Sequence, residues 1–167
     1  MFRLMRRHLQ EIPQRDAVEI LETATSGVLA LSGNDGYPYA VPMSYVYCDG
    51  RIYFHGAKSG HRLDAVKGCD RASFCVVAQD DVEPLDYSTR YRSVIVFGRI
   101  RIMEDEAEIR RAIEMLAIRY APMDTVEHRE KAIADEYDIM TMYELKVEHM
   151  TGKESRSLMR ERMEKLV

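Results

Sequence analysis

Three short β-type segments separated by two tight turns set the strongest constraint on how this chain folds. GVLALS (residues 27–32), YAVPMSYVY (39–47) and RIYFH (51–55) are rich in β-branched and aromatic residues, as strands usually are. The turns between them are SGNDG (32–36) and Asp49-Gly50, whose residues tolerate a left-handed backbone. Strands joined this closely pair side by side, so the sequence predicts an antiparallel meander.

The remaining segments predict further strands with helices inserted between them. Apolar residues recur at helical spacing over 105–120, whereas 142–150 alternates apolar and polar side chains as a half-exposed strand does. The other predicted helices are 14–25, 63–68 and 126–136, the other strands are 71–79 and 91–104, and 80–88 is a predicted loop. Gly98, inside a strand, predicts a bulge or a barrel bend. About six antiparallel strands favour a mainly β fold with inserted helices, a closed or nearly closed barrel.

Size and charge limit the classes of protein that this chain can represent. Its 167 residues suit a single domain, expected over 1–167 with a basic, amphipathic tail at 159–167. The net charge of −4 argues against general nucleic-acid binding. No apolar run approaches the roughly 18 residues that span a membrane, and no secretory signal is recognisable. The three cysteines form neither a disulfide framework nor a metal motif, so we expect a cytoplasmic protein.

The segment YFHGAKSGHRLDAV (residues 53–66) combines a strand end, a glycine-bearing turn and a helix start. Free backbone N–H groups and the positive end of a helix attract anions, and Lys58 and Arg62 add charge. The order of residues matches neither a Walker loop nor a dinucleotide fingerprint. Phosphate binding and a solvated basic turn are equally open at this point. His55 and His61 have no carboxylate or cysteine at a ligand spacing, so no metal site is predicted.

Pro42 marks a second unusual position, because proline cannot donate a hydrogen bond within a sheet. It predicts a sheet edge, a bulge, or an interrupted strand that faces a ligand. No serine or cysteine stands beside a recognisable base, so any chemistry is expected to belong to a cofactor. The tyrosines around Pro42 are compatible with such a site and equally with packing of the barrel.

Four stretches together resemble the FMN-binding split-barrel family related to pyridoxamine 5′-phosphate oxidase, and within it the nitroimidazole-resistance branch. They are GVLAL…GYPYAVPMSYVY, IYFHGAKSGHRLDAV, YRSVIVFGRIRIMED and EHMTGKES. Their order and spacing match the family over residues 12–158, which would form the core of the domain. The combination of the HGA-x-x-G-x-[KR]-L turn with the TGKES ending is the specific part of the match.

The resemblance implies a homodimer with FMN at the interface between the subunits. The residues that would line the isoalloxazine ring are Val41, Pro42, Met43, Ser44 and Tyr45, continued by His55, Gly56 and Ala57. Those that would surround the phosphate are Lys58, Gly60, His61 and Arg62. The TGKES segment and the strand Tyr91–Arg99 are candidates to complete the pocket from the partner chain.

The resemblance also implies an FMN-dependent oxidoreductase that acts on a small molecule. A nitroimidazole or another nitroaromatic is the candidate substrate, NADH or NADPH the candidate donor, and His55 the expected catalytic residue. The ending RERMEKLV differs from the arginine-containing tail of true pyridoxamine phosphate oxidases. Two alternatives are an FMN-binding protein without turnover, for storage or sensing, and a haem-binding split barrel using His149 or His128.

Overall fold

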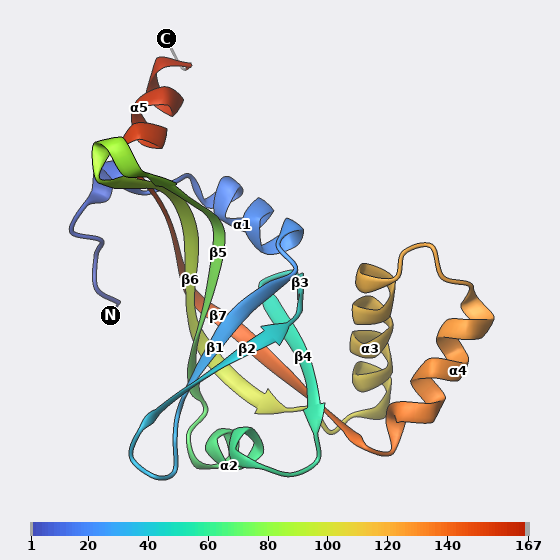
Figure 1. Cartoon of the computed structure of the whole chain (residues 1–167). Coiled ribbons are helices and arrows are strands. Elements are labelled where there is room, and N and C mark those ends of the chain that lie inside the picture. The colour runs from blue at the N-terminus through green and yellow to red at the C-terminus, as the bar shows by residue number, and fades with distance from the viewer. Residues whose placement is uncertain (1, 166–167) are drawn as a thin grey trace.

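A computed structural model describes residues 2–165, which form one seven-stranded antiparallel sheet with helices around it (Figure 1). The order of strands across the sheet is β2-β1-β5-β6-β7-β4-β3. The strands are β1 (Ser26–Ser32), β2 (Pro38–Ser44), β3 (Val46–Cys48), β4 (Arg51–Ala57), β5 (Arg71–Glu83), β6 (Ser88–Ile102) and β7 (Met140–Glu154). The mainly β, antiparallel barrel predicted from the sequence is confirmed, with seven strands instead of about six.

The barrel closes where β2 meets β3. These two strands stand at opposite ends of the sheet order, yet only Tyr45 separates them along the chain. Ser44 pairs with Ser26 of β1, whereas Val46 pairs with Tyr53 of β4. The prediction of a single strand over 39–47 was therefore wrong, because the chain changes partner strand at Tyr45 and splits the barrel there.

The barrel interior is filled by the inward-facing residues of every long strand. Leu29, Phe54, Phe74, Val96 and Leu145 are fully buried, each contributed by a different strand. The Phe74 ring packs edge-on against the rings of Tyr45 and Phe54, at centroid distances of 4.8 and 5.2 Å. Aromatic rings favour this geometry over face-to-face stacking, so the barrel has a closely packed core.

Strands β5 and β6 form a longer hairpin than the sequence predicts. Their register runs on through Asp80↔Tyr91 to Glu83↔Ser88, and the 3-10 turn η2 (Pro84–Asp86) closes it. The predicted loop at 80–88 was therefore wrong for residues 80–83, which belong to β5, and for Ser88, which begins β6. Their polar side chains are exposed or half-buried, so no apolar face marked them as a strand. The bulge predicted at Gly98 lies opposite it, since the β6–β7 register shifts between Phe97 and Gly98 and the extra residue, Glu148, belongs to β7.

Helices surround the barrel and a pair of them stands beside it (Figure 1). They are the 3-10 helix η1 (His8–Gln10), α1 (Gln14–Thr23), α2 (His61–Gly68), α3 (Glu106–Tyr120), α4 (Val126–Tyr137) and α5 (Arg156–Glu164). Asp105 and Thr125 cap α3 and α4 through their side chains. The α3–α4 pair packs on strands β3, β4 and β7 through a second apolar cluster that includes Val46, Leu116 and Met142.

The tail predicted at 159–167 is helical as far as Glu164, where α5 ends, and Lys165 follows in a turn. Residues 166–167 lie outside the described chain. Within residues 2–165, no helix is both long enough and apolar enough to cross a membrane.

Candidate functional site

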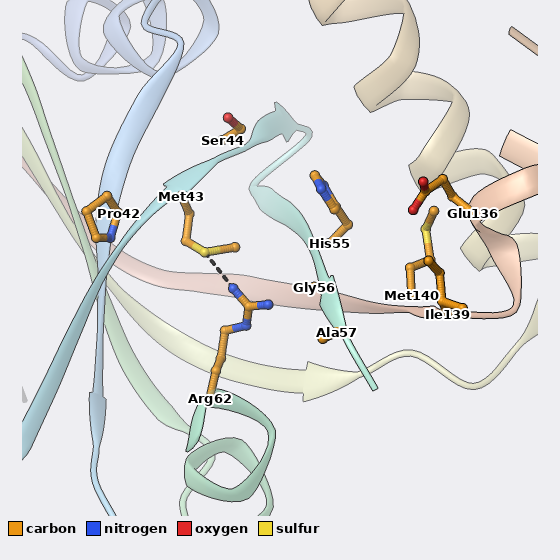
Figure 2. A pocket seen from close by; sticks show the side chains of 10 residues that line it. All are labelled: Pro42, Met43, Ser44, His55, Gly56, Ala57, Arg62, Glu136, Ile139 and Met140. Carbon is orange, nitrogen blue, oxygen red and sulfur yellow. Dashed lines mark hydrogen bonds between the residues drawn. The ribbon is translucent and has the colours of Figure 1, made fainter. Parts of the chain in front are cut away.

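A cavity of about 450 Å³ lies beside the break between β2 and β3 (Figure 2). Four elements form its wall: the end of β2, the end of β4, the start of α2 and the turn from α4 into β7. The lining residues are Pro42, Met43, Ser44, His55, Gly56, Ala57, Arg62, Glu136, Ile139 and Met140. Its volume falls within the range of small-molecule sites, about 300–1,000 Å³.

Seven of the twelve residues predicted from the sequence line this cavity. The segment Pro42–Ser44 lies on one side, His55–Ala57 on the other, and Arg62 between them. Pro42 is exposed and belongs to β2, the first strand in the sheet order, so the predicted edge position is confirmed. Pairing of Ala57 with Met140 brings the start of β7 to the same place. Residues far apart in sequence thus meet where the barrel splits.

The other five predicted residues do not line the cavity. Val41 packs against the barrel core, and Tyr45 is fully buried within it. Lys58 and Gly60 are exposed in the turn before α2. His61 faces the β1–β2 hairpin, where its ring stacks on Tyr39 at a centroid distance of 4.2 Å. Consecutive residues of a helix point about 100° apart, which separates the side chains of His61 and Arg62.

The Arg62 guanidinium is the main charged group in the cavity. Its Nη1 lies 2.8 Å from the Met43 sulfur, and its charge stands over the Tyr143 ring at 5.3 Å. Gly56 gives it room, because a Cβ there would lie 1.5 Å from Nη2. Within the described chain Arg62 forms no ion pair, and its buried Nε has no hydrogen-bond partner. Nearly all buried polar groups find partners, so this guanidinium is prepared to bind an anion.

The turn before Arg62 has the backbone geometry that the sequence predicts. Gly60 has φ of 112°, a value that side chains other than glycine rarely allow, and precedes the first residue of α2. Lys58 and Ser59 are exposed beside it. Arg62 and the first turn of α2 therefore offer positive charge to the same side of the cavity.

His55 stands at the end of β4, with its ring at the upper side of the cavity (Figure 2). Partial burial lowers the pKa of His55, the positive charge of Arg62 lowers it further, and Glu136 opposes both effects. The imidazole is consequently neutral at neutral pH. In this state one ring nitrogen donates a hydrogen bond and the other accepts one.

Helix α3 fastens the β2–β3 break, a contribution that sequence reasoning missed. The Tyr120 hydroxyl accepts a 2.8 Å hydrogen bond from the backbone N–H of Tyr45 and also contacts the carbonyls of Tyr45 and Thr25. The Arg119 guanidinium donates to the carbonyls of Glu22 and Ala24 and lies over the Tyr45 ring. In the sequence Tyr120 counts only as the last member of an apolar stripe, which gives no sign of the hydroxyl's role.

The TGKES ending and the strand Tyr91–Arg99 meet each other within one chain, at the other end of β7. The carboxylate of Glu154 is fully buried there. Arg92 donates to one of its oxygens at 3.2 and 3.3 Å, and Arg162 of α5 donates to the other at 2.6 Å. These residues therefore hold α5 against the sheet, while their predicted role in a partner's pocket stays a prediction.

The two histidines named for a haem site lie apart. His149 stacks on Phe2 at 4.7 Å on the outer face of the sheet. His128, on α4, contacts Asp124 through Nδ1 at 2.9 Å, and the contact lowers the pKa of Asp124. In the part of the chain that the structure describes, no three metal-ligating side chains gather into a site.

The fold and the cavity define a split β-barrel whose opening carries Arg62, an arginine with no ion pair within residues 2–165. A family model described as pyridoxamine 5′-phosphate oxidase matches residues 13–154, so the chain belongs to that family. No curated protein matches the chain in a sequence comparison.

Solved structures share the fold. A candidate 5-nitroimidazole antibiotic resistance protein from Bacteroides thetaiotaomicron is 21% identical with a TM-score of 0.73, covering 86% of this chain and 85% of its own. A conserved hypothetical protein from Mycobacterium tuberculosis is 19% identical with a TM-score of 0.77, covering 93% and 92%. An FAD- and haem-binding protein from Mycobacterium smegmatis is 23% identical with a TM-score of 0.72, covering 88% and 74%. These likenesses confirm the predicted split-barrel fold.

Proposed function

We propose that this protein binds FMN in the cavity at the β2–β3 break and uses it to transfer electrons to a small molecule. The observation that carries the proposal is Arg62, a half-buried cation with an unpaired Nε and no ion-pair partner within residues 2–165. A phosphate group would supply the missing partner. Neighbouring structures that are named for FAD binding support a flavin in this fold.

FMN fits this arrangement better than a larger flavin, because the cations form one group. Arg62 and the N-terminal turn of α2 suit a single terminal phosphate. The unpaired edge of β2 and the backbone at Gly56 and Ala57 are placed to contact a flat ring between them. FMN, when bound, supplies the electron-transfer chemistry, and the chain supplies binding, orientation and protons.

His55 is the side chain that we assign to proton handling. It lines the cavity at the strand end, and its lowered pKa keeps it neutral at neutral pH. A neutral imidazole can donate a hydrogen bond to a ring nitrogen or a substrate atom and accept another. Nitroaromatic reduction with NADH or NADPH as donor is the reaction that we put forward, supported by the candidate nitroimidazole-resistance neighbour.

We also propose a homodimer that brings a second chain to the cavity. Pro42, Val28, Cys75 and Ile95 lie opposite one another on four adjacent strands, so their side chains form an apolar row on the outer face. Val28 and Ile95 are each 39% exposed. The row begins at the cavity wall, and Ile95 belongs to the strand predicted to contact the partner. The three free cysteines suit a cytoplasmic location.

The first experiment is an absorbance spectrum of the purified protein with mass analysis of the cofactor released on denaturation. Bands near ~375 and ~450 nm with the mass of FMN are expected, because the flavin carries the redox chemistry. The mass of FAD would overturn the FMN assignment. A Soret band near ~400 nm instead would favour the haem alternative. A colourless protein that takes up no added FMN would remove the proposal altogether.

Turnover and assembly need separate measurements. Oxidation of NADH or NADPH that depends on a nitroaromatic acceptor is expected, and FMN binding without any turnover would favour the storage or sensing alternative. For the dimer, sedimentation of the Ile95→Lys variant should show monomers with weakened FMN binding. Val82→Lys, a change at an exposed valine of the β5–β6 hairpin, is the matched control and should remain dimeric.

A further inference from the structure

A second cavity of about 460 Å³ lies between α3 and α4 and opens beside the first. Ser44, His55, Glu136 and Met140 line both cavities. A molecule in the α3–α4 cavity would therefore have one end next to His55 and next to whatever occupies the first cavity.

The walls of the α3–α4 cavity are mostly apolar. Ile113, Leu116 and Ala117 of α3 face Ala132 and Ile133 of α4 across it. A volume of this size holds a compact ring, and apolar walls stabilise one through the hydrophobic effect. The cavity thus suits a small, largely apolar molecule.

Three polar side chains in this wall have hydrogen-bond partners in the protein. His128 and Asp124 contact each other at 2.9 Å, and the Tyr120 hydroxyl holds the β2–β3 break. Arg129 has a side chain only 13% exposed and lies 3.9 Å from the Glu114 carboxylate, and its buried Nε has no hydrogen-bond partner within the described residues. The Glu114 carboxylate offsets part of the Arg129 charge, which is the only Lys or Arg charge among the lining residues.

Glu136 differs from these groups, because it forms no ion pair with any other residue between 2 and 165. It stands where the two cavities join, facing the side on which His55 lies (Figure 2). A carboxylate in this position repels a negatively charged molecule that approaches His55 and accepts a neutral or positive one.

We propose that the α3–α4 cavity is the substrate pocket, that it takes a compact apolar molecule without negative charge, and that Glu136 selects against anions. The proposal rests on the proposed function, since the substrate would meet the flavin beside His55. It names the chemistry of the substrate and assigns α3 and α4 a role beyond holding the barrel closed.

The test uses three nitro compounds of similar size: nitrobenzene, para-nitrobenzoate and para-nitrobenzylammonium. With the FMN-loaded protein, para-nitrobenzoate should show a KM about tenfold higher than nitrobenzene does, the effect of ~1.4 kcal/mol. The ammonium compound should show a KM no higher than nitrobenzene does. Glu136→Gln should reduce the benzoate-to-benzene ratio to about threefold or less by removing the repelling charge. An unchanged ratio in this variant would overturn the role of Glu136.

Position 132 tests the cavity itself. Ala132→Phe fills it and should raise the KM for nitrobenzene about tenfold with FMN affinity unchanged, whereas Ala134→Phe, on the other side of α4, should change it less than about twofold. Equal effects of the two variants would overturn the pocket assignment.

Methyl NMR separates this proposal from the proposed function. With ¹³C-methyl alanine labelling of the full chain, nitrobenzene should shift the methyl signals of Ala117 and Ala132 and leave Ala134 unmoved. If FMN binds but these signals do not shift, the pocket is wrong and the flavin site stands. If the signals shift in a protein that cannot bind FMN, the proposed function is wrong.

Discussion

The two ends of β7 place arginines in opposite situations. At its start, next to Gly56 and Ala57, Arg62 stands half-buried without an ion pair in the described chain. At its end, Arg92 and Arg162 hold the fully buried carboxylate of Glu154. Arg62 and Glu154 both belong to segments by which the chain resembles its family.

The difference separates the Glu154 charge, which stabilises the fold, from the Arg62 charge, which is available to bind a ligand. The acceptors of Glu154 are all satisfied, because each carboxylate oxygen accepts from one arginine and Gln10 donates to the backbone carbonyl. The Arg62 group is incomplete, since its nearest polar contact is a thioether sulfur. We therefore expect changes at Glu154 to affect stability and changes at Arg62 to affect cofactor binding.

The largest effect is expected from removing both partners of Glu154. The double variant Arg92→Met/Arg162→Met leaves a fully buried carboxylate without counter-charge, which should lower the free energy of unfolding by about 3–5 kcal/mol. Urea denaturation measures this loss. Arg160→Met, an exposed neighbour on α5, is the control and should change stability by less than about 0.5 kcal/mol. A stable double variant would remove the contrast between the two ends.

The second effect concerns Arg62 and tests the other half of the contrast. Arg62→Met should weaken FMN binding about 30-fold, because a charge-assisted hydrogen bond is worth ~2 kcal/mol. The free energy of unfolding without FMN should stay within about 0.5 kcal/mol, since no ion pair is lost. Flavin fluorescence titration measures the affinity. Lys67→Met, at the far end of α2, should bind FMN normally, and equal losses in both variants would point to a general charge effect.

A smaller effect is expected where α3 fastens the break between β2 and β3. Tyr120→Phe removes the acceptor of the Tyr45 N–H, which should lower the free energy of unfolding by about 1–1.5 kcal/mol. FMN binding should weaken as well, because Ser44 precedes the released residue. Thermal denaturation and flavin titration give the two numbers. Tyr137→Phe on α4 is the matched control, and a stability change there as large as at position 120 would contradict the assigned role of the Tyr120 hydroxyl.

The sequence revealed those parts of the site that lie close together along the chain. Gly56 and Arg62 stand six positions apart in one turn, so their role follows from glycine tolerance and charge. Pro42 indicated an edge, a bulge or an interrupted strand, and the change of partner strand follows three residues later, at Tyr45. The sequence of this turn does not predict which side chains enter the cavity. In the structure Arg62 lines the cavity, whereas His61 stacks on Tyr39.

Residues brought in by long-range packing could not be predicted. Glu136 and Met140 reach the cavity only because β7 pairs with β4, a register that no local pattern discloses. In the sequence Tyr120 belongs to an apolar stripe, and only the fold brings its hydroxyl to the backbone N–H of Tyr45. Glu154 belongs to the TGKES motif, through which the chain resembles its family. The motif alone does not tell whether this carboxylate stabilises the fold or contacts a ligand.

The smallest effect links Arg62 to the protonation of His55. The positive charge of Arg62 helps to lower the pKa of His55, so Arg62→Met should raise this pKa towards its usual value of 6.5. An NMR pH titration of the imidazole signals measures the change directly. Glu136→Gln should shift the pKa of His55 the opposite way, because the carboxylate raises it. An unchanged pKa in both variants would show that burial alone controls this histidine.

The same shift makes stability depend on pH in a defined direction. Because the pKa of His55 is lower in the folded protein, the unfolded chain takes up the proton first as the pH falls. The contribution of His55 to the free energy of unfolding is therefore fully present above pH 6.5 and is lost as the pH falls through the lower folded value. In Arg62→Met this loss should be smaller, since the two pKa values lie closer together. A larger loss in that variant would contradict a direct interaction between Arg62 and His55 in the cavity.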